Sequence, residues 1–340
     1  MRKAIWLILM SILVFTPSLF AEGSSESSDQ EDYKVLHVYT ALDTEVAQYF
    51  IENFEMSSGM EVEFVRMSAG EVLARVEAEA ENPQASVWFG GSNPSHISAA
   101  GKGLLEPYRP NIPYDVSEEF HAEDYSWNGF YTAAIGFVSN TEFLQENGIE
   151  APASWDDLLD PVYASQVEMA YPYTSGTAYT TWATRIQMLG LEAALDWWEE
   201  FDVSIHQYTR SGSACVARVG LGETGVGIAF THDILGKGID KGYPVVLSFP
   251  SEGTGYEVGG ISLIKGAKEP EEARIFIDWA YSDEAQSLFQ DVFYLPVNPN
   301  APIAEGGIPL SEINLIEYDA ITVGENKEAY VTAWRDRIGQ

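Results

Sequence analysis

The segment Lys34-Val-Leu-His-Val-Tyr-Thr-Ala-Leu-Asp43 decides the fold class of this chain. Its first six residues, which are largely β-branched or aromatic, predict a strand, and the next three predict a short turn. Asp43 is typical of a helix N-cap. Four apolar residues follow it at helical spacing: Val46, Phe50, Ile51 and Phe54. The segment therefore predicts a strand that leads through a short turn into an amphipathic helix.

More elements of the same kind follow along the chain. They are a strand at Glu61–Val65, a helix through Val72, Leu73 and Val76, and a strand at Ser86–Phe89 that ends in Gly90-Gly91-Ser92-Asn93-Pro94. This β-α-β-α-β order with short connections predicts an α/β domain with a largely parallel sheet. Ligands of such sheets bind beyond the carboxyl ends of the strands, so Thr40 and Ser92 become candidate site residues at one edge.

Two long extended segments, Phe130–Val138 and Glu257–Ile264, enclose a second group of predicted elements. Two α/β lobes joined by two extended strands form a hinge with a cleft between them. We therefore expect two lobes, each a mixed, mainly parallel sheet flanked by helices. The expected boundaries are 33–132 plus 262–305 for the first lobe and 133–261 for the second, with C-terminal helices in 306–340 that the pattern assigns to neither.

The N-terminus has the pattern of an export signal. Arg2 and Lys3 precede an apolar run that ends near Ala21, as in a secretory signal peptide. The run is slightly short for a membrane span and is interrupted by serine and proline, which favours cleavage over anchoring. We expect a signal peptide at residues 1–21 and a disordered leader, rich in Ser, Glu and Asp, at 22–32.

Charge and cysteine content exclude several classes of function. The net charge is −34, and it becomes −36 when Arg2 and Lys3 leave with the signal. A chain this acidic repels phosphate backbones and anionic lipid, so we expect no nucleic-acid partner and no membrane insertion after signal cleavage. Cys215 is the only cysteine, which excludes an intramolecular disulfide and a zinc site built on thiolates. No cofactor is expected.

A candidate anion site lies in the stretch Tyr173-Thr-Ser-Gly-Thr-Ala-Tyr179. A helix that begins at Ser175, Gly176 and Thr177 directs free backbone N–H groups, two hydroxyls and the positive end of its dipole at one point. An ordinary helix N-cap is the alternative interpretation. Ser211 and Gly212, followed by Ser213, offer a second cluster of donors, although their composition also fits a simple turn.

Motifs of common enzymes are missing from the sequence. It has no G-x-S-x-G elbow, no H-E-x-x-H, no P-loop and no G-x-G-x-x-G after the first strand. Ser92, His232 and Asp233 offer the residue types of a catalytic triad, but adjacent His and Asp residues rarely orient each other correctly. We therefore expect a protein that is not an enzyme, with a hydrolase or phosphatase as the alternative.

The order of several short motifs resembles a known family. The motifs are Tyr39-Thr-Ala-Leu-Asp43, Val87-Trp-Phe-Gly-Gly-Ser92, Ser175-Gly-Thr-Ala-Tyr179, Tyr208-Thr-Arg-Ser-Gly-Ser213, Gly225-Val-Gly-Ile-Ala-Phe-Thr-His-Asp233 and Asp278-Trp279 with Ser282. The chain resembles the periplasmic substrate-binding proteins of ABC importers, in the branch usually described as ferric-iron binders. The resemblance implies a type II, two-lobed, periplasmic and monomeric protein that closes on a small anionic solute and delivers it to an inner-membrane permease.

One departure from the branch is informative about the ligand. Ferric-binding members carry adjacent tyrosines where this chain reads Phe230-Thr231-His232-Asp233, and the chain contains no Tyr-Tyr pair. Fe(III) prefers anionic oxygen ligands, so the loss of two phenolates removes most of its site. The Thr-His-Asp sequence is similar to that of a subgroup that binds hexose phosphates. That resemblance implies that His232, Asp233 and Glu257 hold sugar hydroxyls.

The residues themselves predict a ligand with two different ends. Donors at the candidate anion site suit a phosphate, whereas carboxylates suit hydroxyls or an ammonium group. A sugar phosphate fits this pattern, and an aminoalkylphosphonate or polyamine-type solute and ferric iron with a synergistic anion remain the alternatives. Arg210 is a candidate for added charge, and Tyr173, Tyr208 or Trp88 for packing against a sugar ring. A helix cap with a salt-bridged histidine is the alternative role of His232 and Asp233.

Overall fold

The computed structural model describes residues 34–339, so the predicted signal peptide (1–21) and leader (22–32) lie outside the described residues. The strands are β1 (Leu36–Thr40), β2 (Val62–Arg66), β3 (Val87–Ser92), β4 (Leu105–Glu106), β5 (Asn128–Asn140), β6 (Val167–Ala170), β7 (Ile205–Thr209), β8 (Val226–Phe230), β9 (Val245–Ser248), β10 (Tyr256–Ile264) and β11 (Leu295–Pro296).

The α-helices are α1 (Thr44–Ser58), α2 (Ala69–Ala78), α3 (Asn93–Gly101), α4 (Thr141–Asn147), α5 (Gly176–Leu189), α6 (Leu191–Phe201), α7 (Ala214–Gly220), α8 (Thr231–Asp233), α9 (Pro270–Ala280), α10 (Asp283–Ser287), α11 (Ala320–Glu325) and α12 (Lys327–Ile338). A π-helix, η5 (Ile234–Ile239), continues directly from α8. Single 3₁₀ turns lie at Glu118–Phe120, Asp156–Leu159, Pro161–Tyr163, Asp202–Ser204, Leu288–Val292 and Leu310–Glu312.

The first third of the described chain forms the predicted β-α-β-α-β unit. β1 pairs in parallel with β2 on one side and with β3 on the other. Helix α1 buries Phe50, Ile51 and Phe54 of the predicted apolar stripe, and Val46 is partly buried against the same core. The parallel arrangement follows because each helix returns the chain to the starting edge of the sheet.

The sheet is mixed because a late strand enters its centre. The strand order is β2-β1-β3-β10-β5-β8-β6-β7, and β10 runs antiparallel to both β3 and β5. Beyond β5 the order continues with antiparallel β8, followed by the parallel strands β6 and β7. β10 also extends β3: Ser92 pairs with Gly259, so β3 reaches Ser92, whereas the sequence pattern predicts a strand over Ser86–Phe89.

The two extended segments predicted as crossings are neighbouring antiparallel strands, β5 and β10. β5 is 13 residues long, and its first half pairs with β10 and β11 while its second half pairs with β8 and β9. β10 pairs with β3, β4 and β5 on the side of the first strands. β5 therefore connects the two halves of the sheet directly.

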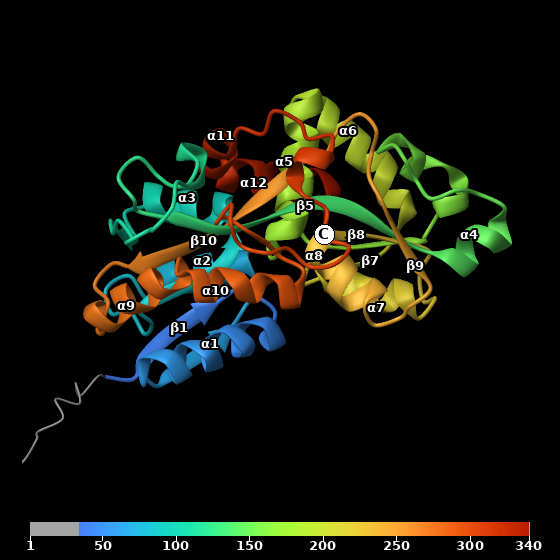
Figure 1. Ribbon diagram of the computed structural model, residues 1–340. Helices are drawn as coiled ribbons and strands as arrows, with labels where there is room; N and C mark the ends of the chain where they lie inside the picture. The colour runs from blue at the N-terminus through green and yellow to red at the C-terminus, as the bar shows by residue number, and fades with distance from the viewer. Residues whose placement is uncertain (1–33, 340) are drawn as a thin grey trace, which may run out of the picture. The chain divides into compact units, whose positions relative to one another are not determined.

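Separate hydrophobic cores flank the two halves. The largest core on the side of β1–β3 includes Phe50, Phe54, Phe89, Phe130 and Phe276. The largest core on the side of β6–β8 includes Trp155, Tyr179, Trp182, Trp198 and Trp334. Helix α10 packs against α1 although the two are distant in sequence (Figure 1). Two cores on one long connecting strand are what a pair of hinged lobes requires.

The C-terminal helices contact both halves of the molecule. α11 packs on α3, and α12 packs on α6 and α3. Val323 of α11 and Trp334 of α12 belong to the core on the side of β6–β8. Sequence pattern assigns 306–340 to neither lobe, and the packing gives the reason, because these helices bridge the two. Within residues 34–339, none of the helices has the length and apolar character that a bilayer crossing requires.

Candidate functional site

A polar cavity of about 430 Å³ lies where strand-to-helix connections meet. These connections are β1–α1, β2–α2, β3–α3, β6–α5, β7–α7 and β8–α8, and all run from the carboxyl end of a strand. Tyr131 of β5, Glu257 of β10 and Tyr294 complete the wall. Ligands of open α/β sheets bind at this edge, so the cavity is the candidate functional site.

The start of α5 forms one end of the cavity. Ser175 is the N-cap, and its hydroxyl accepts a hydrogen bond from the Ala178 N–H at 3.4 Å. The N–H groups of Gly176 and Thr177 have no partner within residues 34–339. A side chain at position 176 would collide with the Ser92 hydroxyl, so glycine is needed there. The helix has 14 residues, and its dipole places positive potential at this end.

A second cluster of donors adjoins the first. Gly212 packs so closely against Ser175 and Thr177 that an added Cβ would clash with both. The neighbouring Ser211 and Ser213 hydroxyls lie 3.3 Å apart. Arg66, at the end of β2, donates from Nη2 to the Ser211 hydroxyl at 3.2 Å, and its Nε donates to the Leu42 carbonyl. The two clusters therefore form one continuous donor surface with a guanidinium at its edge.

Two more helix starts contribute hydroxyls to this end. Ser68 caps α2 through a capping box with Glu71 and donates to the Arg210 carbonyl at 3.2 Å. Ser92 precedes α3, and its hydroxyl is buried without a hydrogen-bond partner in the described part of the chain. A buried hydroxyl without a partner is costly in a folded protein, so Ser92 is a candidate contact for a bound solute.

His232, Asp233 and Lys237 form the opposite side. The His232 ring stacks on Tyr294 with centroids 3.7 Å apart, and its Nε2 lies 3.5 Å from the Asp233 carboxylate. The Lys237 ammonium lies 2.9 Å from the same carboxylate and also pairs with Asp43. Burial alone raises the pKa of Asp233, but the nearby Lys237 and His232 outweigh it, and the pKa lies well below its usual value. Asp233 is therefore ionised.

Glu257 lies between the two sides and has different electrostatics. It is buried, and burial together with the negative charge of Asp233 raises its pKa well above the usual value, against a smaller opposing effect of Tyr131. The Tyr131 hydroxyl accepts a hydrogen bond from the Gly91 N–H at 3.2 Å. Burial likewise raises the pKa of Tyr131 and of Tyr294, so both phenols are neutral. Among the carboxyl groups that line the cavity, Asp233 is thus ionised and Glu257 protonated.

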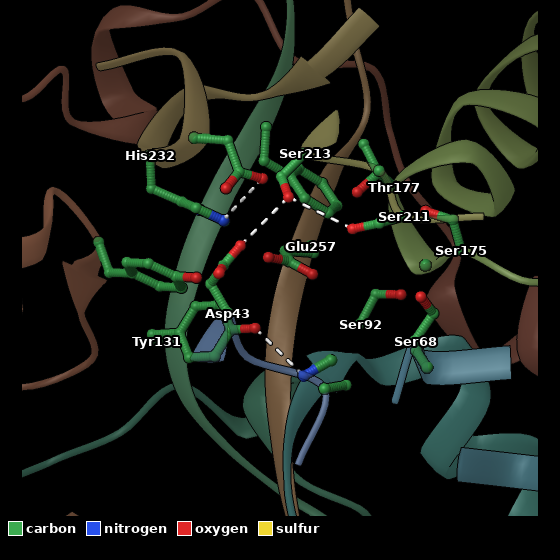
Figure 2. A pocket seen from close by; sticks show the side chains of 18 of the residues that line it. Asp43, Ser68, Ser92, Tyr131, Ser175, Thr177, Ser211, Ser213, His232 and Glu257 are labelled. Carbon is green, nitrogen blue, oxygen red and sulfur yellow. Dashed lines mark hydrogen bonds and ion pairs between the residues drawn. The ribbon is translucent and has the colours of Figure 1, made fainter. Parts of the chain in front are cut away.

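Figure 2 shows how these groups are distributed. Ser68, Ser92, Ser175 and Thr177 gather on one side of the view, and Asp43, Tyr131 and His232 on the other, with Glu257 between them. The arrangement presents hydrogen-bond donors and positive potential at one end of the cavity and carboxyl groups at the other.

Most of the predicted site residues meet at this cavity. Those that line it are Ser92, Ser175, Gly176, Thr177, Ser211, Gly212, His232, Asp233 and Glu257. Thr40 does not line it: its hydroxyl donates to the Phe89 carbonyl and accepts from the Leu42 N–H, and so holds the β1–α1 turn. His232 and Asp233 are the second and third residues of α8, whose N-cap is Phe230, and neither makes a side-chain cap bond. The salt-bridged histidine of the helix-cap alternative is present, but the cap itself is not.

Several other expectations differ from the structure. Arg210 is exposed and pairs with Glu71, so it is not part of the cavity wall. Trp88 is fully buried and stacks on His96, and Tyr208 is buried with its hydroxyl donating to Asp202. Tyr173 stacks on Tyr171. These aromatic rings pack within the cores, whereas the aromatic residues that line the cavity include Tyr131, Phe230 and Tyr294.

Sequence reasoning missed part of the cavity wall. Asp43, expected only as a helix cap, makes no cap bond and instead accepts from Ser213 and Lys237. Arg66 is the last residue of a strand, the same kind of position as Thr40 and Ser92. Its position at a strand end could therefore have marked it as a candidate site residue. Tyr131 lies inside a strand and Tyr294 in a loop, and no local pattern marks either of them.

The carboxyl and imidazole groups of this site do not form a metal centre. Within residues 34–339, no cluster of three or more His, Cys, Asp or Glu side chains has the arrangement to hold a metal ion. The wall offers hydrogen-bond donors and acceptors instead.

The geometry defines a class of protein: a two-lobed α/β molecule with a polar binding cavity beyond the strand ends. A family model of bacterial extracellular solute-binding proteins matches residues 88–321, and the chain belongs to this family. It is a substrate-binding protein of the ABC-importer class, and its family and solved neighbours are periplasmic binding proteins.

Particular relatives place the chain more closely. An uncharacterised protein of Haemophilus influenzae is 35% identical over 96% of this chain and 97% of its own. A probable ABC transporter periplasmic-binding protein of Sinorhizobium fredii is 23% identical over 78% of this chain and 76% of its own. Relatives named for iron uptake and for 2-aminoethylphosphonate binding are 24% and 23% identical.

One solved structure is informative about the fold. The periplasmic binding protein AfuA of Actinobacillus pleuropneumoniae, solved with fructose 6-phosphate bound, has a TM-score of 0.86 and 33% identity to this chain. The match covers 90% of this chain and 98% of AfuA. It confirms the predicted type II, two-lobed fold, whereas the lobe boundaries given above stay a prediction.

Proposed function

We propose that this protein captures a hexose phosphate in the cavity and delivers it to the inner-membrane permease of an ABC importer. The observation that carries the proposal is the division of the cavity into a donor-rich end and a carboxyl-bearing end (Figure 2). The fructose 6-phosphate bound to AfuA supports it.

The phosphate occupies the donor-rich end. The N–H groups of Gly176 and Thr177, the hydroxyls of Ser175 and Ser92, and the Arg66 guanidinium at the edge provide donors and positive potential there. Helix N-termini bind phosphate groups through free N–H groups and the helix dipole. The overall acidity of the chain does not prevent this, because distant surface charge is screened beyond about 8 Å at physiological salt.

The sugar hydroxyls occupy the carboxyl-bearing end. The ionised Asp233 accepts hydrogen bonds from hydroxyls, and the protonated Glu257 can both donate and accept. His232 and the neutral phenol of Tyr131 add further partners of both kinds. A polyol, whose hydroxyls also both donate and accept, matches this mixture.

The alternative ligands fit the wall less well. An aminoalkylphosphonate or polyamine needs free carboxylates for its ammonium group, but Lys237 already pairs with Asp43 and Asp233. Glu257 is neutral, so it offers no charge. Fe(III) needs anionic oxygen ligands, and burial keeps the Tyr131 and Tyr294 phenols protonated.

The remaining features of the proposal follow from the role of a solute-binding component. The N-terminal signal at residues 1–21 is removed on export to the periplasm, and the mature protein works as a monomer. The sugar phosphate leaves chemically unchanged, so incubation with glucose 6-phosphate releases no free phosphate.

Isothermal titration tests the proposal. The mature protein, stripped of solute by unfolding and refolding, is titrated with glucose 6-phosphate and fructose 6-phosphate, and separately with glucose, inorganic phosphate, 2-aminoethylphosphonate and ferric citrate. We expect saturable one-to-one binding of a hexose phosphate and none of glucose or phosphate alone, because only the phosphorylated sugar contacts both ends.

Two outcomes would contradict the proposal in different ways. Binding of ferric citrate with tyrosinate absorbance and no response to either sugar phosphate would assign the cavity to iron. Tight binding of 2-aminoethylphosphonate alone would mean that Lys237 gives way to the ligand's ammonium group.

A further inference from the structure

A three-membered ion cluster spans the two halves of the molecule. Asp43 follows β1 in one half, whereas Asp233 and Lys237 follow β8 in the other. The Lys237 ammonium pairs with Asp43 and lies 2.9 Å from the Asp233 carboxylate. Lys237 lies on the π-helix η5, a rare form of helix that is frequent at functional sites.

The cluster lies on the wall between the candidate site and a second cavity of about 600 Å³. The two cavities share four wall residues: Asp43, His232, Asp233 and Tyr294. Lys237 lines the second cavity and joins Asp43 to Asp233 across the shared wall. In the part of the chain that the structure describes, the other side-chain partner of the Asp43 carboxylate is the uncharged Ser213 hydroxyl.

Burial makes this ion pair stronger than the other pair that crosses the cavity. The Lys237 and Asp43 side chains are 31% and 28% exposed, and Asp233 is 9% exposed. Arg210 also crosses to the β2–α2 side and pairs with Glu71, but its side chain is 79% exposed. Exposed ion pairs contribute little because water and salt screen them, whereas partly buried charges attract each other more strongly.

We infer that Lys237 is a latch that keeps the two lobes together around a bound solute. It holds the wall closed by bridging Asp43 to Asp233, and it fixes the orientation of the Asp233 carboxylate toward the cavity. The second cavity is then the side on which the solute leaves when the bridge breaks. The latch itself rests on the two-lobed fold, whereas the orienting of Asp233 rests on the function proposed above.

Dissociation kinetics test the latch. Glucose 6-phosphate release is followed by stopped-flow tryptophan fluorescence in the wild type and in Lys237→Met, Lys237→Arg and Arg210→Ala. We expect the dissociation rate of Lys237→Met to rise about tenfold or more, with a smaller change in the association rate, because the loss of a partly buried charged partner acts mainly on dissociation. Lys237→Arg restores slow release, and Arg210→Ala stays within about twofold of the wild type.

A measurement that does not depend on the ligand separates the latch from the proposed function. Met56 on α1 and Leu221 after α7 are 76% and 64% exposed and lie on opposite halves, and the native Cys215 is buried. Spin labels at Met56→Cys and Leu221→Cys report the distance between the lobes. We expect Lys237→Met and Asp43→Asn, which removes only the cross-lobe half of the cluster, to shift the distribution to longer distances.

Each result has a defined meaning. Unchanged distances in both Lys237→Met and Asp43→Asn would overturn the latch even if glucose 6-phosphate binds. Longer distances together with no sugar-phosphate binding would keep the latch and reject the proposed ligand. An equal effect of Arg210→Ala and Lys237→Met on the distances would also overturn it, since any cross-lobe charge would then do the same.

Discussion

At the scale of single residues, Glu257 gives the clearest electrostatic prediction. Its pKa in the folded protein is raised by burial and by Asp233, relative to about 4.3 in an unfolded chain. The stability it contributes is fully present below about pH 4.3 and is lost as the pH rises through the folded pKa. We expect Glu257→Gln, which resembles the protonated acid, to gain thermal stability over the wild type as pH increases from 4.5 to 8.

Thermal unfolding of the two proteins across that range checks this prediction. Asp233→Asn serves as the comparison, because the pKa of Asp233 is lowered and the carboxylate is already stabilised by Lys237 and His232. Its stability relative to the wild type should fall, with no gain toward higher pH. A Glu257→Gln difference that does not depend on pH would show that the carboxyl group is ionised in the folded protein.

The role of Arg66 at the donor-rich end can be tested through the affinity for glucose 6-phosphate. Its guanidinium contacts the Ser211 hydroxyl at the edge of the donor-rich end, whereas Arg210 points to Glu71. We expect Arg66→Met to weaken glucose 6-phosphate binding about tenfold or more, as for the loss of a charge-assisted hydrogen bond. Isothermal titration of Arg66→Met beside Arg210→Met measures it, and equal losses in the two would argue against a local role for Arg66.

Residue types and their order along the chain predicted much of the site. Ser175 and Thr177 could be named because helix starts carry recognisable signals, whereas His232 and Asp233 were named through the resemblance to the hexose-phosphate-binding subgroup. Asp43 does occupy the predicted N-cap position of α1, but its carboxylate makes no cap bond. An acidic residue before a helix looks the same in sequence whether it contacts the helix or, as here, a distant lysine. Tyr131 and Tyr294 reach the cavity through tertiary packing alone, which local pattern cannot report.

At the scale of elements, the contact between α5 and the β7–α7 turn shapes the donor surface. Gly212 lies against Ser175 and Thr177, and an added methyl group would displace their hydroxyls. We expect Gly212→Ala to fold but to lose most of its affinity for glucose 6-phosphate. Gly101→Ala is the matched control, because an added Cβ at Gly101 meets nothing within 4 Å and the φ angle there is not positive. Gly242→Ala would not serve, because the φ of 75° at Gly242 strains any side chain.

Circular dichroism and titration of the two variants together check this prediction. Retained affinity in Gly212→Ala would mean that the two donor clusters do not share one ligand. Unfolding of Gly212→Ala alone would assign the glycine to packing and leave Ser175→Ala as the test of the donor surface.

The attachment of helix α12 provides a prediction about stability. Lys327 is buried, its ammonium lies 3.3 Å above the centre of the Tyr179 ring, and burial lowers its pKa to about 7. An unfolded lysine titrates near 10.4, so the folded state loses stability from this group as the pH falls from about 10.4 to 7. We expect Lys327→Met to melt at a higher temperature than the wild type, with the largest gain at or below pH 7.

Differential scanning calorimetry at pH 6 and pH 9 checks that expectation. A larger gain at pH 9 than at pH 6, or a loss at both, would show that the attraction between the ammonium and the Tyr179 ring outweighs the cost of burial.

Elements were predictable where the pattern is local. The first parallel unit, α5 after Ser175 and the Ser282 cap of α10 all follow the sequence signals. The position of β10 between β3 and β5 could not be predicted from local sequence signals, because its partner strands lie more than a hundred residues earlier in the chain. β10 adds antiparallel pairs with both β3 and β5, and its pairing with β3 extends that strand to Ser92.

At the scale of the whole molecule, the shared strand β5 and the cross-lobe contacts explain how the two halves together form one cavity. Each half contributes helix starts, and the donor-rich end draws on both, through Ser68 and Ser92 from one half and Ser175 and Ser211 from the other. A solute that contacts both halves shifts the hinge toward closure. The donor-rich and carboxyl-bearing ends of the cavity and the Lys237 latch then act together to capture the solute.

The orientation of the bound solute tests the central claim most directly. A crystal structure of the mature protein with glucose 6-phosphate should place the phosphate at the N-terminus of α5, against Ser175 and Thr177, with sugar hydroxyls on Asp233 and Glu257. A phosphate bound beside Lys237 instead, with the sugar ring against Ser175, would contradict the claim that the two ends of the cavity recognise two ends of a sugar phosphate.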